Sequence, residues 1–369
     1  MHHNPKHHPE NNPEYKGLTV HQGIENVPTV NPYRKSAPRR RQYSADEFVE
    51  GILKGDISML SQAVTLVESS LPEHQHVAQK VIEKCLPYAG NSVRLGITGV
   101  PGAGKSTFIE ALGMHLIRSG KKLAVLAIDP SSERSKGSIL GDKTRMEELS
   151  VAKNAFIRPS PSAGSLGGVA RKTRESIILC EAAGFDTIFV ETVGVGQSET
   201  SVHSMVDFFL LIQLAGTGDE LQGIKRGIME MADGIAINKC DGSNVDKAKV
   251  AKTQYQNALH LFPAPESGWT PEAITCSSVE LSGISDVWEM VKKYISYVKS
   301  NEYFELKRIS QAKYWMYETI NEQLKANFYQ DNEIQKMLIE SENKVLSDEL
   351  SSFVAAKNLL DKYFGGKNK

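Results

Sequence analysis

The stretch GVPGAGKST, residues 99–107, holds the residues of this 369-residue chain whose types and spacing most clearly predict chemistry. It matches the pattern GxxxxGKS, in which glycines let backbone N–H groups turn toward phosphate oxygens. The ammonium group of Lys105 would neutralise the β- and γ-phosphates, and the hydroxyl of Ser106 would coordinate Mg²⁺. We therefore predict a site for a nucleoside triphosphate. Its expected contact residues are Gly99, Pro101, Gly102, Ala103, Gly104, Lys105, Ser106 and Thr107.

The motif NKCD, residues 238–241, predicts which base the site accepts. The carboxylate of Asp241 can accept hydrogen bonds from both N1–H and the 2-amino group of guanine. Adenine has an acceptor at N1 and lacks the 2-amino group, so the motif favours GTP over ATP. The aliphatic stem of Lys239 would lie over the base, and Asn238 would tie this loop to the phosphate loop. Downstream, TCSSVELSGI supplies Ser277 and Ser278, whose backbone could meet guanine O6 as the SAK element of GTPases does.

Acidic residues at the ends of the following strands are the expected metal and hydrolysis groups. Glu191 begins ETVG at the place where small GTPases usually carry DxxG, and the N–H of Gly194 could sense the γ-phosphate. Asp142, in the polar segment GDKTR, is a candidate for a switch that reaches the metal. We assign no residue to position the attacking water. The predicted Mg²⁺ ligands are Ser106, Asp129, Asp142 and Glu191, and the predicted catalytic residues are Lys105, Asp129, Asp142 and Glu191.

Five short runs rich in Val, Ile and Leu must position these residues. They are VRLGITG, KLAVLAID, FDTIFVET, DFFLLIQLA and GIAINKCD, and each ends in a polar or glycine-rich turn. Continuous apolar character predicts strands covered on both faces, as in a parallel sheet with flanking helices. The fold class is therefore α/β, and ligands are expected at the carboxyl ends of the strands, where the polar clusters fall.

The chain divides into four predicted parts. Residues 1–43 are rich in His, Asn, Pro and Arg and are expected to form a disordered arm. Residues 44–91 are expected to be helical, with Ser44 and Glu47 in capping-box spacing and Phe48, Ile52 and Leu53 on one face. The nucleotide-binding domain is expected over 92–284. Residues 285–369 have a helical pattern, and this excess of helix beyond a complete domain predicts a core extension or a self-association surface.

Composition narrows the class of protein. The formal net charge is −1 and the sequence pI is near 6.8, so there is no basic field to attract nucleic acid or anionic lipid. The four cysteines form no CxxC pair, which argues against a zinc site and a disulfide framework. No apolar run approaches the roughly 18 residues that a membrane span needs. We predict a cytoplasmic protein without nucleic-acid or membrane partners.

Several segments resemble the MeaB/ArgK family of cobalamin-associated G proteins more specifically than a generic GTPase would. They are AIDPSS, GDKTRM, RPSPSAGSLGGVARKT, ETVGVGQSE and GDELQGIKRGIMEMAD. The resemblance extends from about residue 44 to the end of the chain. It implies a P-loop NTPase of the SIMIBI type that binds GTP, GDP and Mg²⁺. It also implies a chaperone that hydrolyses GTP and assists cofactor loading, protection and reactivation of an adenosylcobalamin-dependent acyl-CoA mutase, most often methylmalonyl-CoA mutase.

The resemblance adds roles that the residues alone do not predict. GTGDELQGIK, residues 216–225, matches the additional switch of the family, with Gln222 and Lys225 as candidates for coupling nucleotide state to the mutase. The C-terminal helices of the family form a homodimer, so a homodimer is expected here. Two departures are small: Cys240 stands where Ala is usual in NKAD, and Ser278 stands where Ala is usual after Ser.

Three other functions compete with this interpretation. A metal-insertion GTPase for a nickel enzyme would share the fold, but the paired histidines near the N-terminus are the only ligands that fit it. An ATP-using kinase linked to amino-acid transport is disfavoured by Asp241. A binding module with a purely structural GTP site would show turnover that no partner changes.

Overall fold

The computed structural model describes residues 41–129, 146–161, 166–192, 198–215 and 226–365. Asp142, Gly194, Gln222 and Lys225 lie outside these ranges. Ser44–Lys369 form one compact unit, distinct from Met1–Tyr43.

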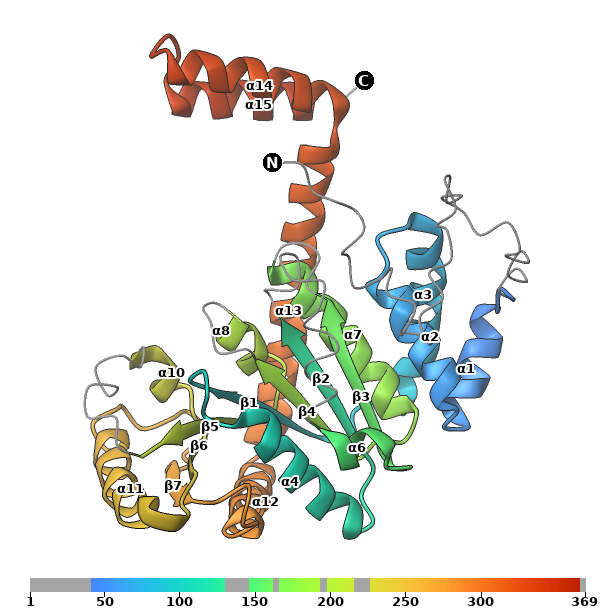
Figure 1. Ribbon diagram of the computed structural model, residues 1–369. Helices are drawn as coiled ribbons and strands as arrows, with labels where there is room; N and C mark the ends of the chain where they lie inside the picture. Colours follow the sequence, from blue (N-terminus) through green and yellow to red (C-terminus); the bar gives the residue numbers. More distant parts are fainter. Residues whose placement is uncertain (1–40, 130–145, 162–165, 193–197, 216–225, 366–369) are drawn as a thin grey trace, which may run out of the picture. The chain divides into compact units, whose positions relative to one another are not determined.

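A seven-stranded, fully parallel sheet forms the centre of the larger unit (Figure 1). Its strand order is β3-β2-β4-β1-β5-β6-β7. The five predicted strands are confirmed as β1, β2, β4, β5 and β6, whereas the two edge strands, β3 and β7, were not predicted. The strand bounds are β1 Val93–Gly99, β2 Leu123–Asp129, β3 Ala155–Pro161, β4 Thr187–Thr192, β5 Phe208–Leu214, β6 Gly234–Asn238 and β7 Glu272–Thr275.

Helices cover both faces of the sheet, which confirms the expected α/β architecture. On one face, α4 (Lys105–Arg118), α6 (Glu147–Val151) and α12 (Ile284–Ser300) pack on a core that includes Leu95, Ile97 and Phe208. On the other face, α11 (Val245–Leu259) packs on Ile235 and Ile237. The same face carries α7 (Leu166–Ala182), α8 (Ser198–His203) and α10 (Arg226–Glu230). The central strands are therefore buried on both sides.

Within the described residues, three helices precede the sheet: α1 (Ala45–Leu53), α2 (Ile57–Glu68) and α3 (Pro72–Cys85). The predicted capping box is present, because Glu47 N–H donates to Ser44 Oγ at 3.3 Å and Ser44 N–H donates to Glu47 Oε2 at 2.8 Å. Phe48 and Ile52 are buried as expected, but Leu53 is 38% exposed, so its assignment to the apolar face was wrong. A short 3-10 turn, Leu86–Tyr88, connects α3 to the sheet.

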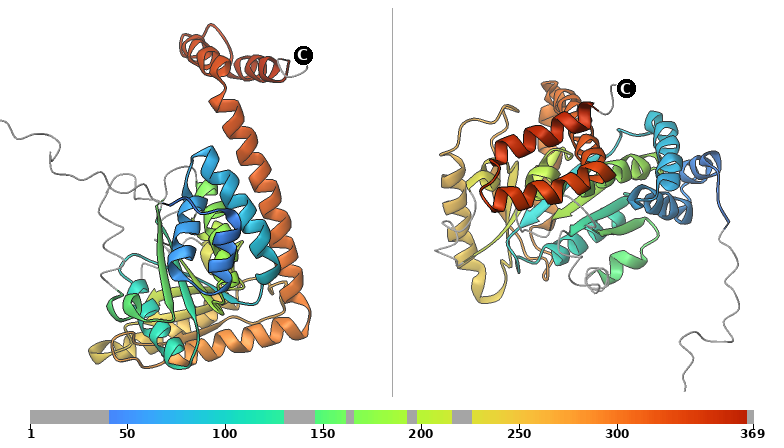
Figure 2. Two further views of the ribbon diagram at one scale, coloured as in Figure 1. Left: turned by 90° about the vertical axis from the view of Figure 1, so that its right-hand side faces the viewer. Right: turned by 90° about the horizontal axis from the view of Figure 1, so that it is seen from above.

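Three helices follow α12: α13 (Tyr303–Gln330), α14 (Asn332–Leu346) and α15 (Ser352–Gly365). The first half of α13 lies against α7 and α8, and its far end leads into the hairpin of α14 and α15 (Figure 2). Trp315 is buried, whereas Met316, Ile320 and Leu324 are each about half exposed. Within the described ranges, no helix combines the length and apolarity that crossing a lipid bilayer requires.

A buried ionic network joins α13 to the amino-terminal edge of the sheet. Arg308 donates to both carboxylate oxygens of Asp207 at 2.8 Å and to the carbonyl oxygen of Ser92 at 2.7 Å. Arg94 donates to both oxygens of Glu181 at 2.8 and 2.9 Å, and its own N–H donates to Asp207. These contacts fix the base of α13 on the edge opposite the predicted nucleotide site.

Candidate nucleotide-binding site

The phosphate loop connects β1 to α4 at the carboxyl edge of the sheet. A Cβ atom on Gly99 would lie 2.3 Å from the carbonyl oxygen of Ile212 on β5, so no other residue fits this position without a shift of the backbone. Gly104 has a φ of 83°, and a Cβ there would lie 2.9 Å from Nδ2 of Asn238. Gly99 is therefore required by close approach to the backbone of β5, and Gly104 by its left-handed backbone conformation and its closeness to the Asn238 side chain, as the motif predicts.

The amino-terminal end of α4 is arranged to receive an anion. Among the described residues, no N-cap side chain hydrogen-bonds to the start of α4, and the helix dipole favours negative charge at this end. Lys105, the first residue of α4, donates through Nζ to the carbonyl oxygens of Gly99 and Val100 at 2.9 and 3.4 Å. Its ammonium group thus lies over the loop. Pro101, Gly102 and Thr107 are exposed at the surface of this loop, and Ala103 is fully buried.

Two of the predicted metal ligands meet beneath this loop. Ser106 Oγ donates to Glu191 Oε1 at 3.3 Å, and both side chains are more than nine-tenths buried. Glu191 lies near the end of β4 and is in register with Ile97 of β1. Among the described residues, no group of three or more His, Cys, Asp or Glu side chains could hold a metal ion by itself. A hydroxyl and a carboxylate nevertheless suit Mg²⁺, which takes hard oxygen ligands and usually retains waters and substrate phosphates.

Asp129, a third predicted metal ligand, lies on a neighbouring strand. Asp129 is the last residue of β2, where its backbone pairs in register with Pro161 of β3. This position is on the same edge of the sheet as the phosphate loop. Asp142 and Gly194 lie outside the described residues, so their roles stay predictions.

Asn238 connects the guanine-recognition loop to the phosphate loop, as the sequence predicts. Its Nδ2 donates to the carbonyl oxygen of Ala103 at 2.9 Å. Its Oδ1 accepts from the backbone N–H of Ser278 at 3.1 Å and from Ser278 Oγ at 2.8 Å. Asn238 is 1% exposed, so these bonds are shielded from water. One amide therefore holds three loops in a fixed relation.

The carboxylate of Asp241 is hydrogen-bonded to the loop that follows β7. Ser277 Oγ donates to Asp241 Oδ2 at 2.6 Å and also accepts from the N–H of Glu280 at 3.0 Å. Lys239 is exposed and has a φ of 59°, a left-handed conformation that turns the chain sharply after β6. Asn244 Nδ2 donates to the Lys239 carbonyl at 2.7 Å and supports this turn. Asp241 precedes the short 3-10 turn Gly242–Asn244.

Sequence reasoning missed the role of the Ser278 hydroxyl. The motif predicts contacts through the backbone of Ser277 and Ser278, but the structure uses both of their hydroxyls to hold Asn238 and Asp241. Cys276 supplies a weaker contact, because a thiol is a poor hydrogen-bond donor and its Sγ lies 3.8 Å from Asn238 Oδ1. Burial raises the pKa of this thiol to about 12, which keeps it protonated. The sequence signal for this role was Ser278 itself, because a serine at the position where Ala is usual brings an additional hydroxyl into the site.

Comparison with known proteins assigns this fold and site to a family. Residues 60–333 match the family described as "Methylmalonyl Co-A mutase-associated GTPase MeaB". The chain is 46% identical to "GTPase ArgK" of Escherichia coli over 317 residues, which cover 84% of this chain and 96% of that protein. It is 42% identical to "Methylmalonic aciduria type A homolog, mitochondrial" of Mus musculus over 342 residues, 90% of this chain and 82% of that protein.

A solved structure agrees with both comparisons. The crystal structure of a protein described as "LAO/AO transport system kinase" superimposes with a TM-score of 0.70 at 38% identity, and the match covers 86% of this chain and 97% of that chain. The phosphate loop, the guanine-recognition motif and these similarities agree with one another. The chain belongs to the MeaB family, and it is a P-loop GTPase.

Proposed function

We propose that this GTPase is a chaperone for an adenosylcobalamin-dependent acyl-CoA mutase, with methylmalonyl-CoA mutase as the first candidate. It would use GTP hydrolysis to assist cofactor loading, protection and reactivation of that enzyme. The observation that carries the proposal is the linkage of the three nucleotide loops through Asn238. This geometry supports a GTP site, and the description of the matched family supports a mutase as the partner.

The proposed site residues divide into three groups. The phosphate loop with Lys105 would hold and neutralise the phosphates, and Asn238, Lys239, Asp241, Ser277 and Ser278 would select guanine. Ser106 and Glu191 would hold Mg²⁺ together with Asp129 and Asp142. The metal would neutralise charge on the β- and γ-phosphates, because phosphoryl transfer depends mainly on positioning and electrostatic stabilisation. We therefore expect slow intrinsic hydrolysis that the partner accelerates.

Partner control would follow from two nucleotide-dependent states. The γ-phosphate and Mg²⁺ would order the switch residues, including Gly194, Gln222 and Lys225, and hydrolysis would release them. A mutase that binds one state better shifts the equilibrium only by its differential affinity. Contacts beyond the site support such a link. Trp315 Nε1 of α13 donates to the Ser204 carbonyl at 3.1 Å, directly after α8, and Gln311 Nε2 donates to the Val206 carbonyl at 2.8 Å.

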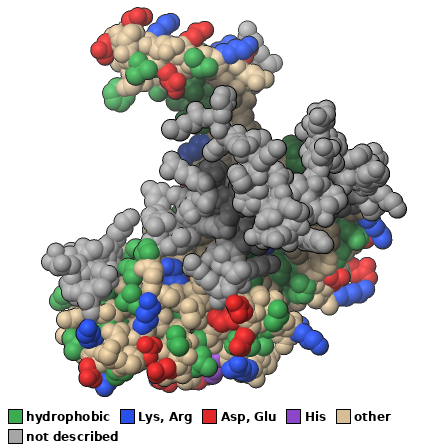
Figure 3. Space-filling view, viewed as in Figure 1, with side chains coloured by type: hydrophobic (Ala, Val, Ile, Leu, Met, Phe, Trp, Pro, Cys, Tyr) green, Lys and Arg blue, Asp and Glu red, His purple; other side chains and the backbone are tan. Residues whose placement is uncertain are grey.

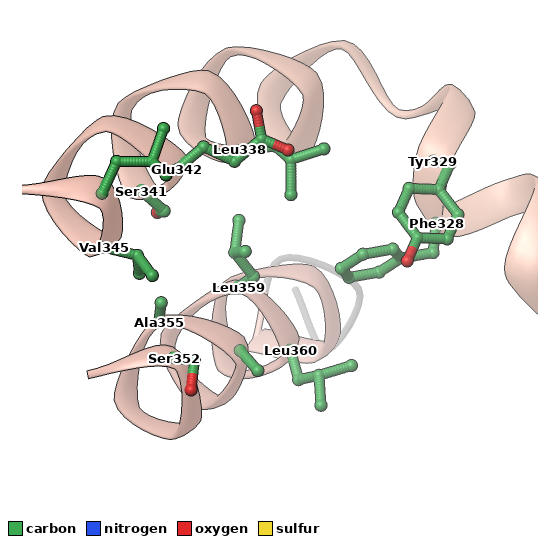
Figure 4. Close-up of a pocket in the computed structure, with 12 residues that line it drawn as sticks. Phe328, Tyr329, Leu338, Ser341, Glu342, Val345, Ser352, Ala355, Leu359 and Leu360 are labelled. Atoms are coloured by element: carbon green, nitrogen blue, oxygen red, sulfur yellow. The ribbon is translucent and has the colours of Figure 1, made fainter. Parts of the chain in front are cut away.

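We also propose that residues 285–369 make the chain a homodimer, with residues 92–284 as the GTP-binding domain. Apolar side chains lie exposed on the C-terminal helices, and Figure 3 shows several of them on the hairpin of α14 and α15. A cavity of about 550 Å³ opens between this hairpin and the end of α13, lined mainly by apolar side chains such as Phe328, Leu338 and Leu359 (Figure 4). A second copy would bury this surface. Sedimentation should give twice the chain mass, and a monomer at micromolar concentration would refute the proposal.

The functional test is GTP hydrolysis by the purified protein, alone and with methylmalonyl-CoA mutase from the same source. Lys105→Ala serves as the blank, and ATP is run in parallel. We expect a slow GTP rate that rises severalfold with the mutase and negligible turnover of ATP. A GTP rate that the mutase leaves unchanged would refute this partner and would direct the search to other acyl-CoA mutases.

A further inference from the structure

Two buried threonines join the ends of the central strands β1 and β4. Thr192 Oγ1 donates to Thr98 Oγ1 at 2.8 Å, and the two residues are 0% and 1% exposed. Thr98 directly precedes Gly99 of the phosphate loop, and Thr192 directly follows Glu191. Removing one partner of such a bond is unfavourable, because the other hydroxyl stays buried without it. The pair is therefore a fixed contact at the point where both strands lead into the nucleotide site.

The bond continues the contact between β1 and β4 beyond their backbone pairing. That pairing ends with Ile97 opposite Glu191, and among the described residues no further backbone pair joins these two strands. Thr98 and Thr192 are the next residue on each strand. On its other side, β4 is held one step further, because Thr192 pairs in register with Ile128 of β2. On the β1 side, the bond between the two hydroxyls holds the end of β4.

The same two strands carry the predicted metal ligands Ser106 and Glu191. Ser106 follows β1 and the phosphate loop, whereas Glu191 lies on β4 itself. The bond from Ser106 Oγ to Glu191 Oε1 is 3.3 Å long, which is beyond the usual range for a hydroxyl donor and too long to fix their separation. That separation therefore depends on how the end of β4 lies against β1. Side chains alternate along a strand, so Thr98 and Thr192 lie on the opposite face from Glu191 and can act on it only through the backbone.

We propose that Thr98 and Thr192 are positioning residues that set the distance between Ser106 and Glu191, and thereby the affinity of the site for Mg²⁺. Their hydrogen bond keeps the end of β4 at a fixed distance from β1, so the hydroxyl and the carboxylate are presented to the metal together. Both threonines act through the strands that carry these ligands. The inference rests on the Mg²⁺ site proposed above and adds two residues to which the motifs give no role.

The test measures Mg²⁺ affinity by titrating MgCl₂ into the protein with a fluorescent GDP bound. Thr98→Val and Thr192→Val keep the shape of the side chain and remove one hydroxyl each. We expect the Kd of Mg²⁺ to rise about fivefold in each variant, which corresponds to the loss of about one hydrogen bond. The Kd of GDP measured without Mg²⁺ should stay within about twofold of the wild-type value, because the residues proposed to hold the nucleotide are unchanged.

Further variants make the comparison specific. The double variant, with valine at both positions, leaves neither hydroxyl buried without its partner, and it should raise the Kd of Mg²⁺ no more than either single change. Thr98→Ser and Thr192→Ser keep the hydroxyls and should retain the wild-type Kd. Thr173→Val is the matched control, since Thr173 is 1% exposed and its Oγ1 donates to the Val169 carbonyl at 3.0 Å within α7. It should lower the Tm and leave the Kd of Mg²⁺ unchanged.

The outcomes separate this inference from the metal site itself. Ser106→Ala removes a proposed ligand and should raise the Kd of Mg²⁺ by more than either valine variant. If Ser106→Ala does so while both valine variants keep the wild-type Kd, the positioning role is refuted and the metal site stands. Additive effects in the double variant would refute the hydrogen bond as their cause. If Ser106→Ala also leaves the Kd unchanged, the proposed Mg²⁺ site fails and this inference fails with it.

Discussion

The guanidinium of Arg308 on α13 donates two parallel hydrogen bonds of 2.8 Å to the carboxylate of Asp207, the residue just before β5. The side chain of Asp207 is 2% exposed and that of Arg308 is 15% exposed, so the pair is largely withdrawn from water. Asp207 also accepts from the backbone N–H of Arg94. A bidentate pair of this kind fixes both the position and the orientation of the long C-terminal helix on the sheet.

The first prediction concerns this pair. Arg308→Met should lower the free energy of unfolding by about 3 kcal/mol, because it leaves the buried carboxylate of Asp207 without its main partner. Urea denaturation monitored by circular dichroism measures the change. Lys54→Met is the control, since its ion pair with Glu50 is exposed on α1 and its loss should have no measurable effect. Equal stability of Arg308→Met and the wild type would contradict the prediction.

The second prediction concerns base selection. In Asp241→Asn, the side-chain amide can still accept from N1–H but presents a donor toward position 2, where xanthine carries an oxygen. GTP affinity should fall about a hundredfold, because hydrogen bonds to a charged group contribute about 1.5–3 kcal/mol each. Affinity for xanthosine triphosphate should rise. Competition binding with GTP, xanthosine triphosphate and ATP checks this, and an unchanged preference for GTP would exclude Asp241 from base recognition.

The third prediction concerns the Ser278 hydroxyl. Ser278→Ala removes one donor to Asn238 Oδ1 and leaves the backbone N–H donor in place. GDP should dissociate about fivefold faster, which corresponds to the roughly 1 kcal/mol of one hydrogen bond. Release of a fluorescent GDP measures the rate. Ser282→Ala, an exposed serine on the same loop, should retain the wild-type rate. Wild-type release by both variants would rule out the role of the hydroxyl.

The fourth prediction concerns pH. Burial, reinforced by the charge of Lys307, lowers the pKa of His203 from 6.5 to about 4, and Asp233 opposes this only in part. Between these values the unfolded chain binds more protons than the folded protein, so this residue makes stability rise with pH from about 4 to 6.5. As pH falls from about 6.5 to 4, the free energy of unfolding therefore decreases, because protons bind the unfolded chain in preference to the folded protein.

Thermal unfolding between pH 4 and 7 tests this effect. His203→Phe keeps a ring against Phe209, whose centroid lies 5.6 Å from that of His203, and should flatten the pH dependence. His260→Phe replaces an exposed histidine and should leave the slope as it is in the wild type. Identical slopes for all three proteins would show that His203 does not titrate in this way.

The centre of the sheet could be predicted from the sequence, but its edges could not. The five predicted strands are buried on both faces, so their residues form continuous apolar runs. β3 at one edge contains Arg158, Pro159 and Pro161, and β7 at the other edge is only four residues long. Edge strands have fewer neighbours and tolerate proline and charge. Their composition therefore resembles that of loops, and only the assembled sheet identifies them.

The site was predictable wherever a motif fixes a residue type by its chemistry. The glycines at 99 and 104, the ammonium of Lys105 and the amide of Asn238 occupy the positions that their motifs require. Side chains that act on other side chains were not predictable, because partners such as Ser278 and Asn238 lie 40 residues apart in sequence.

The length of α13 determines how far a small movement at its attachment to the sheet would displace its other end. The helix has 28 residues, and about 15 of them follow the buried anchor Trp315, which corresponds to about 22 Å of helix. A tilt of about 5° at that anchor would displace the far end by about 2 Å, given the rise of 1.5 Å per residue. A change too small to disturb the packing around Trp315 would thus be amplified where α14 and α15 begin. Movement at Trp315 would therefore change the position of α14 and α15 far more than it changes the sheet beneath α13.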